Sequence, residues 1–188
     1  TAGSRFTVDA LNAERKNITD FLLNHGYYKF HRDFIQYSAD SARNSHDINI
    51  TLHLLPYRTN EQKHDTLHPC YVIDSIYYRT NEDGGTMRLR RSVLRNATML
   101  DAHEPYDANK LEQTYNKFAR FQAVKYTNIT FRERLDTTLL DCEILLNTNK
   151  ANTISFQPEG TNTAGDLGAA ASLTWENRNL FRGSEVLS

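Results

Sequence analysis

The chain of 188 residues carries 22 basic and 23 acidic side chains, which gives a formal net charge of -1. Because neither sign of charge dominates, a dedicated binder of nucleic acid or of another polyanion is disfavoured. The length allows one medium domain or two small ones, and no apolar run approaches the roughly 18 residues of a membrane-spanning helix.

The first third of the chain predicts one helix and two strands. Residues 9–24 carry apolar side chains at helical intervals, and Gly26 supplies the left-handed residue that commonly ends a helix. Residues 27–37 are rich in aromatic and branched side chains, as a strand should be. Residues 47–55 alternate cleanly between apolar and polar side chains and give the best strand pattern of this third.

The polar residues 56–69 break this pattern and mark a boundary between two modules. A second unit follows with a strand, a short helix, a longer helix and two strands, at residues 70–78, 88–94, 107–121, 125–133 and 138–147. A helix, a strand, a polar turn and an alternating strand thus occur in the same order in both halves, which indicates an internal repeat of one α+β unit.

The first copy of this unit lacks the strand that opens the second copy. We therefore expect the chain to begin inside a module, whose sheet then has an empty position. An open sheet edge of that kind invites another strand to pair with it.

In the tail of the chain, apolar residues alternate with small or polar ones. Its apolar positions are Leu167, Ala169, Ala171, Leu173 and Trp175, with small or polar residues between them. One apolar face and a terminal aromatic residue fit a strand of a transmembrane barrel, although a soluble strand would read the same way. Because ordering a free strand costs about 1–2 kcal/mol per residue in backbone entropy, we expect it to add to a module's open edge, in its own chain or in a strand-exchanged homo-oligomer.

Several segments resemble a known family. They are residues 11–15 leading to 24–28, the partner segment 115–131 and, above all, 159–168 together with 179–183. These segments resemble the outer-membrane insertase superfamily, with the greatest likeness to BamA- and TamA-type proteins of the Bacteroides lineage. The glycine-rich stretch near the C-terminus is much more specific than the helix followed by Gly-Tyr.

In that superfamily, periplasmic POTRA modules of β-α-α-β-β order precede a C-terminal membrane barrel. The resemblance implies an α+β chain with two POTRA-like modules, the first without its first strand, followed by an isolated β-barrel strand. The expected boundaries are a partial module at 1–57, a linker at 58–69, a complete module at 70–148 and the start of the barrel at 149–188. Nearly all of the barrel would be missing, so this chain is not expected to insert proteins by itself.

The resemblance also implies a function at the periplasmic face of the bacterial outer membrane. The chain would recruit unfolded outer-membrane proteins or periplasmic accessory proteins by strand addition, and would contact the membrane through the barrel. The expected client-binding edges lie on the strands at 27–37 and 125–133, at Tyr28, Phe30, Lys125, Thr127, Ile129 and Phe131. Equally, a helix or the neighbouring module could cover either edge.

Catalysis has no visible site in the sequence, and neither an enzyme nor a cofactor is expected. His64 and His68 have a ligand-like spacing but lie in the linker, so a solvated loop is favoured over a metal site. The glycines from Gly160 to Gly168 are not followed by Lys-Ser or Lys-Thr, which argues against a phosphate loop. The alternative function is a secreted α+β module that binds a glycan or a peptide through surface tyrosines.

The two cysteines fall on strands that the POTRA order would place side by side. A disulfide between Cys70 and Cys142 is therefore conceivable in the periplasm. Cys142 shares the strand face of Leu140 and Ile144, so a buried free thiol is the favoured interpretation.

Overall fold

The computed structural model describes residues 7–41, 48–58, 65–81, 87–163, 166–179 and 181–184, with the side chains of 161–168 excepted. The chain divides into two compact units. The first comprises Thr1–Ser75, Leu100–Leu111 and Glu133–Asp141, and the second Ile76–Met99, Glu112–Arg132 and Cys142–Ser188. No helix among the described residues has both the length and the apolar character needed to cross a membrane.

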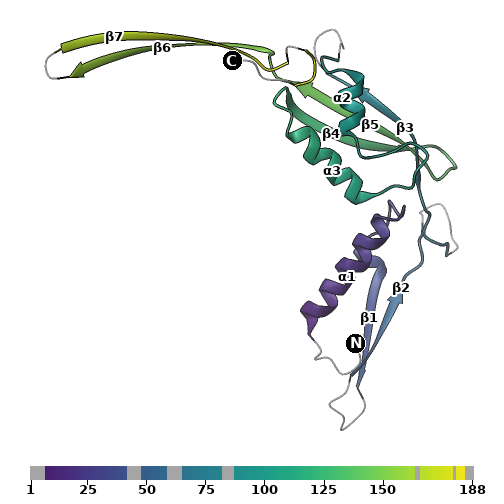
Figure 1. The fold of residues 1–188 in the computed structure, drawn as a ribbon. Helices are drawn as coiled ribbons and strands as arrows, with labels where there is room; N and C mark the ends of the chain where they lie inside the picture. Colours follow the sequence, from purple (N-terminus) through teal and green to yellow (C-terminus); the bar gives the residue numbers. More distant parts are fainter. Residues whose placement is uncertain are drawn as a thin grey trace. The chain divides into compact units, whose positions relative to one another are not determined.

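Helix α1 (Val8–Leu23) opens the first unit (Figure 1). Its start is capped by Thr7, whose hydroxyl oxygen accepts a hydrogen bond from the Ala10 amide at 3.2 Å. Its end is followed by Gly26, which has the left-handed φ of 94° that the sequence predicts there. A Cβ atom at Gly26 would overlap the Cys70 sulfur, so this position needs glycine for space as well as for conformation.

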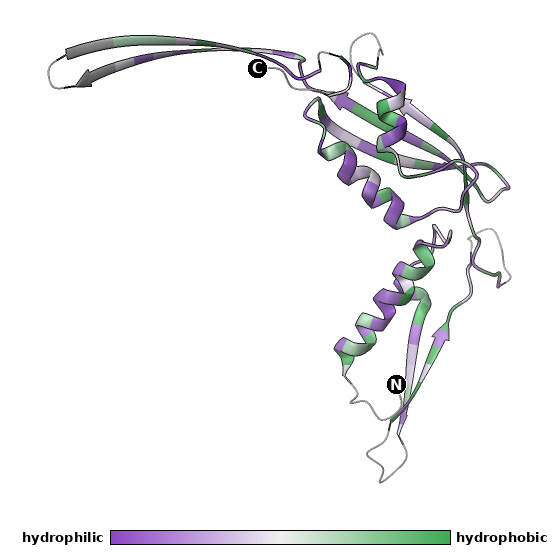
Figure 2. Ribbon diagram, viewed as in Figure 1, coloured by the Kyte–Doolittle hydropathy of each residue, from purple (hydrophilic) through white to green (hydrophobic). Residues whose placement is uncertain are grey.

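Strands β1 (Ile35–Ser41) and β2 (Ile48–Leu54) form an antiparallel two-stranded sheet (Figure 1). Ile35 pairs with Leu54 at one end of the ladder, and Ser41 pairs with Ile48 at the other. Alternate residues of the two strands therefore share an apolar face. Figure 2 shows the alternation of hydrophobic and hydrophilic residues along β2, as the sequence predicts.

The strand expected over residues 27–37 is wrong in its first part, because β1 begins only at Ile35 and follows a short 3-10 helix, η1 (Arg32–Phe34). Tyr28 and Phe30 lie in tight turns instead, where their amides donate to carbonyls two and three residues earlier. The aromatic residues of this stretch pack against one another and against neighbouring rings. Their abundance reflects a packed turn and not a strand.

The segment predicted as the second module contains a three-stranded sheet of order β3-β5-β4, with two helices on one face (Figure 1). The strands are β3 (Val72–Arg79), β4 (Val124–Glu133) and β5 (Leu139–Thr148), and the helices are α2 (Arg91–Ala97) and α3 (Ala108–Ala119). The first and last strands of this module are neighbours, as the POTRA order implies. The last strand, β5, therefore lies at the centre of the sheet.

Strand β5 supplies the centre of the core. Its alternate residues Leu140, Cys142, Ile144 and Leu146 are each 0% exposed. Thr114 of α3 is a buried polar residue, and its hydroxyl accepts a hydrogen bond from the Met99 amide at 3.0 Å. The burial of this row supplies much of the hydrophobic stabilisation of the second module.

Helix α2 begins three positions later than the sequence predicts. The residues before it are held extended by a distant part of the chain: the Arg182 guanidinium donates to the Met87 carbonyl at 2.7 Å, and the Arg90 amide donates to the Arg182 carbonyl at 2.9 Å. A local pattern cannot reveal such a contact, and the predicted helix over 88–94 is therefore displaced.

The tail forms an antiparallel hairpin of β6 (Asn152–Thr163) and β7 (Asp166–Asn177). The expectation of an isolated barrel strand is wrong, and so is its addition to the edge of a module, because β7 pairs along its whole length with the segment just before it. The reason for expecting strand exchange between copies is removed as well. Strand β6 contains Pro158, which is tolerated here because both strands of a two-stranded sheet are edge strands.

Candidate functional site

Strand β4 is an outer strand of its sheet, and β5 is its neighbour. The Arg134 amide just after β4 donates to the Leu139 carbonyl at 3.1 Å and so faces β5. Main-chain groups alternate in direction along a strand. Alternation therefore predicts that those of Lys125, Thr127 and Ile129 face away from β5, toward the open side of the sheet. Just before the strand, the Ala123 carbonyl instead accepts a hydrogen bond from the Asn149 amide at 2.7 Å.

The hydrogen bonds of Tyr115, on α3, confirm that the main-chain groups of Ile129 face away from β5. They also occupy the pairing groups of the β4 edge at that residue. The Ile129 amide donates to the Tyr115 hydroxyl oxygen at 2.9 Å, and the hydroxyl donates to the Ile129 carbonyl at 3.4 Å. A single side chain thus takes the place that the main chain of a further strand would occupy. A strand that pairs with β4 has to displace this hydroxyl at Ile129.

The other outer strand, β3, is covered near its start. The His103 amide donates to the Ile73 carbonyl at 2.6 Å, and the Ile73 amide donates to the Glu104 carbonyl at 2.9 Å. The Tyr106 amide adds a third bond, to the Tyr71 carbonyl at 3.0 Å. These bonds leave the edge of β4 as the more accessible border of the described sheet.

The structure brings four of the six expected client-binding residues together on β4: Lys125, Thr127, Ile129 and Phe131. Lys125 is exposed, Thr127 is half-buried, and Ile129 is 7% exposed. Tyr28 and Phe30 do not belong to a sheet edge, and Phe30 is only 5% exposed. The sequence could not reveal Tyr115, because its helical spacing indicates a core residue.

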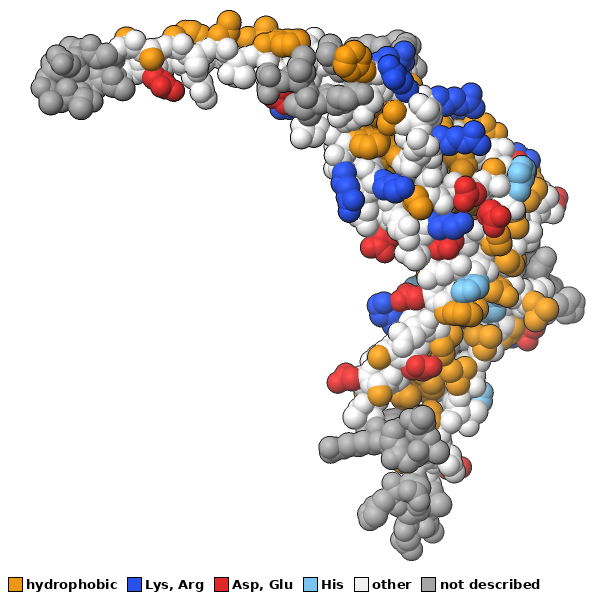
Figure 3. All heavy atoms as spheres, viewed as in Figure 1, with side chains coloured by type: hydrophobic (Ala, Val, Ile, Leu, Met, Phe, Trp, Pro, Cys, Tyr) orange, Lys and Arg blue, Asp and Glu red, His pale blue; other side chains and the backbone are white. Residues whose placement is uncertain are grey.

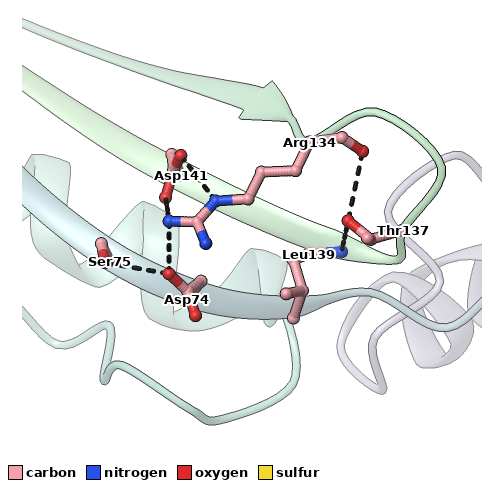
Figure 4. Close-up of polar contacts among 6 residues, drawn as sticks. All are labelled: Asp74, Ser75, Arg134, Thr137, Leu139 and Asp141. Carbon is pink, nitrogen blue, oxygen red and sulfur yellow. Dashed lines mark hydrogen bonds and ion pairs between the residues drawn. The ribbon is translucent and has the colours of Figure 1, made fainter.

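Ion pairs on the polar face of the sheet hold the strands in register. The Arg134 guanidinium makes two hydrogen bonds to the Asp141 carboxylate, at 3.1 and 3.0 Å, and a contact to Asp74 at 2.5 Å (Figure 4). The Thr137 hydroxyl donates to the Arg134 carbonyl at 3.2 Å. The paired guanidinium links β3, β5 and the turn between β4 and β5.

A second group of ion pairs centres on Glu143 of β5, whose side chain is 19% exposed. Its carboxylate contacts Arg79 of β3 at 3.1 Å and Arg132 of β4 at 3.2 Å. Ion pairs therefore connect the central strand to both of its neighbours on the face opposite the core. In the sequence, acidic residues alternate with the buried residues of β5. This alternation is the signal that could have indicated these ion pairs.

The end of β4 is tied to the turn that contains Tyr28. Lys29 Nζ lies 2.6 Å from the Glu133 carboxylate, which also accepts a hydrogen bond from the Tyr71 hydroxyl at 3.2 Å. The hydrogen bond to Glu133 raises the pKa of Lys29. The turn residues thus support the end of the β4 edge and do not form an edge of their own.

The cysteines are both free thiols, so the conceivable disulfide is not formed. Cys70 is exposed and lies just before β3, whereas Cys142 is fully buried in β5. Burial raises the pKa of Cys142 to about 12. The interpretation of Cys142 as a buried free thiol is confirmed.

The β6–β7 hairpin has one apolar face that no described element covers. Ile154 pairs with Trp175, and Phe156 pairs with Leu173. These side chains are exposed to 70, 45, 65 and 72%, respectively. Figure 3 shows hydrophobic side chains in orange along one side of the hairpin. Ala169 and Ala171 belong to the same face, whereas the side chain of Leu167 lies outside the described ones.

The described residues hold no group of three or more His, Cys, Asp or Glu that could bind a metal ion. His64 lies outside the described residues. His68 has a structural role: a ring nitrogen lies 2.9 Å from the Leu55 carbonyl oxygen, and its ring packs edge-on against Phe30 and Phe34.

Comparison with known proteins gives a likeness of fold. No family model matches the chain, and no curated protein matches it. The crystal structure of BamA from Haemophilus ducreyi lacking POTRA domains 1–3 is similar with a TM-score of 0.64 at 12% identity, over 98% of this chain and 31% of that one. BamA POTRA domains 3–5 from Haemophilus influenzae give a TM-score of 0.50 at 12% identity, over 78% of this chain and 50% of that one.

The chain thus spans about a third and a half of these two structures. At 12% identity the likeness shows the fold alone. It agrees with the POTRA-like arrangement that the sequence predicts, in which small sheets carry few helices.

Proposed function

We propose that this chain is a periplasmic scaffold of an outer-membrane protein assembly or translocation factor, and that it recruits unfolded β-barrel clients or accessory proteins by strand addition. The likeness of fold to BamA supports this proposal. The modules bind and position an extended polypeptide and carry out no catalytic step. The expected boundaries at 1–57, 58–69, 70–148 and 149–188, and the likeness to the Bacteroides lineage, remain predictions.

The observation that carries the proposal is the direction of the main chain along β4. The Ile129 amide and carbonyl face the open side of the sheet, and alternation predicts the same direction for Lys125 and Thr127, where an extended chain would pair with them. Main-chain pairing does not depend on the partner's side chains. It therefore suits a scaffold whose clients share the ability to form strands but no sequence motif.

The hairpin is the proposed contact with the membrane. Its apolar face would lie against lipid as the start of the barrel, with Trp175 near the end of β7 and so at the membrane surface. Its other face carries Ser155, Gln157 and Ser172 and would face the polar interior. In this proposal the two modules lie on the periplasmic side of the outer membrane.

Proline substitution in β4 tests the strand addition. Thr127→Pro removes an outward amide without removing a bond to β5, so the sheet should persist while the affinity for an extended barrel-strand peptide falls. The loss of one main-chain bond corresponds to about a fivefold weaker Kd, measured by fluorescence anisotropy. Tyr126→Ala, an exposed change on the opposite face, is the control and should leave Kd unaltered. Unchanged affinity in Thr127→Pro contradicts edge pairing.

Removal of the Tyr115 hydroxyl should strengthen peptide binding, whereas Thr127→Pro should weaken it. In Tyr115→Phe the client no longer has to displace the bonds to Ile129, so peptide affinity should rise about fivefold. Tyr126→Phe is the matched control, because Tyr126 is 53% exposed. A lower affinity in Tyr115→Phe, with the fold intact by circular dichroism, argues that the peptide binds elsewhere.

The alternative function, a glycan- or peptide-binding module, requires exposed tyrosines gathered in one concavity. Tyr77 and Tyr126 are 46% and 53% exposed, but they lie on β3 and β4 with β5 between them. This separation favours the scaffold over the alternative.

A further inference from the structure

An arginine-rich segment leads into α2 and is distinct from the β4 edge. Residues 87–95 contain four arginines and no acidic residue, although the whole chain is nearly neutral. In Figure 3 blue side chains gather over the part of the second module that carries α2. Positive charge is therefore concentrated in this segment, although the net charge of the whole chain is close to zero.

This segment lines a pocket of about 540 Å³. Arg90, Arg91 and Arg182 contribute the charges, and Tyr77, which is 46% exposed, contributes apolar surface. The nearby arginines Arg79 and Arg178 are paired with Glu143 and Glu176. Among the described ion pairs none involves Arg90, Arg91 or Arg182. The pocket therefore combines apolar surface with positive charge that no described carboxylate neutralises.

The pocket is built from two distant parts of the chain. The Arg182 guanidinium donates to the carbonyls of Met87 and Arg88, at 2.7 and 3.2 Å, and the Asn179 side-chain amide donates to the Arg88 carbonyl at 3.2 Å. Arg182 has a left-handed φ of 61°, which a residue other than glycine adopts only where its surroundings fix it. The turn after β7 is thus held against the segment before α2.

This contact places the arginines at the base of the hairpin. The turn follows β7 directly, and Trp175 lies near the end of that strand. If the hairpin enters the membrane as proposed above, its base lies at the level of the lipid headgroups, where aromatic residues gather. Phosphates are the negatively charged groups that lipids offer at that depth.

We propose that this pocket binds the phosphate of an anionic phospholipid headgroup at the periplasmic surface of the membrane. Guanidinium groups pair with phosphate through two parallel hydrogen bonds, which suits Arg90 and Arg91 to this role. The exposed Tyr77 side chain, which also lines the pocket, packs against the apolar part of the lipid next to the phosphate. The inference rests on the proposed membrane contact and adds a specific lipid site to it.

Vesicle flotation of the full 188-residue chain tests the site. Vesicles of phosphatidylcholine alone report the contact of the hairpin, and the additional binding to vesicles with phosphatidylglycerol reports the pocket. The double variant Arg90→Gln/Arg91→Gln should lose most of this additional binding, by about fivefold for each arginine. Arg32→Gln/Arg120→Gln removes the same charge from exposed positions elsewhere and should keep it.

Further variants separate the possible outcomes. Arg90→Lys/Arg91→Lys keeps the charge but loses the paired hydrogen bonds, and should bind between the wild type and the glutamine variant. Phe156→Ser/Trp175→Ser should lose binding to both kinds of vesicle through the apolar face, so a wild-type chain that ignores neutral vesicles contradicts the proposed membrane contact.

Four results overturn the lipid site itself. The first is an equal loss in the two glutamine variants, which indicates unspecific attraction. The second is an unchanged preference for phosphatidylglycerol in Arg90→Gln/Arg91→Gln, with the fold intact by circular dichroism. In the third, that variant loses binding to an acidic peptide and keeps its vesicle binding, which assigns the pocket to a protein partner. Binding to free glycerol phosphate without vesicle preference likewise contradicts a headgroup site.

Discussion

Two strands with the same alternating pattern have opposite burial in this molecule. The apolar residues of β5 are 0% exposed, whereas Ile48, Ile50, Leu52 and Leu54 of β2 are 41, 39, 42 and 54% exposed. Strand β5 lies between β3 and β4, but the only described partner of β2 is β1. The alternation determines which side chains share a face, and the neighbouring elements determine whether that face is buried.

The sequence predicts a first module without its first strand, and by analogy with β3 beside β5 that empty position would be the unpaired side of β2, next to the exposed apolar row. The predictions below test whether the contrast between β2 and β5 holds in solution.

The largest expected effect is on thiol reactivity. Because the pKa of Cys142 is raised from 9.0 to about 12, its thiolate fraction at pH 8 is about a thousandfold lower than usual. Iodoacetamide should label Cys70 rapidly and Cys142 only on unfolding, as followed by mass spectrometry. The neutral thiol stabilises the fold fully below pH 9.0, and this stabilisation is lost as pH rises toward 12. Equal labelling rates at pH 8 contradict the burial of β5.

Truncation of one isoleucine on each strand compares the two rows directly. Ile144→Ala on β5 should lower the free energy of unfolding by about 2–5 kcal/mol, because it leaves a cavity in a closed core. Ile50→Ala on β2 should cost less than about 1 kcal/mol, since that side chain is already 39% exposed. Urea unfolding measures both values, and similar losses would mean that β2 is buried in solution.

The smallest of these effects concerns the turn between α1 and β1. Gly26→Ala forces a side chain into a left-handed position against the Cys70 sulfur and should cost about 1–3 kcal/mol. Gly160→Ala on β6 is the matched control, because no heavy atom lies within 4 Å of its added Cβ, and should stay within about 0.5 kcal/mol. Thermal unfolding that shows no difference between them argues against the left-handed turn.

Local patterns in the sequence predicted much of this fold. Alternation located β2 and β5, and Gly26 marked the end of α1. The features that the sequence missed depend on contacts between distant residues. Arg182 delays the start of α2, and the bond from Tyr115 to Ile129 appears only when α3 lies beside β4. Such contacts leave no periodic signal, so the sequence indicated the edge strand but not the side chain on it.

The central claim is that the main chain of β4 receives an extended client, and amide hydrogen exchange by NMR tests it most directly. With an unfolded barrel-strand peptide in excess, the outward amides of Lys125 and Thr127 should gain protection. The inward amides of Tyr126 and Asn128 should change little, because they already face β5. Equal protection of both sets, or protection confined to another part of the chain, would contradict the account.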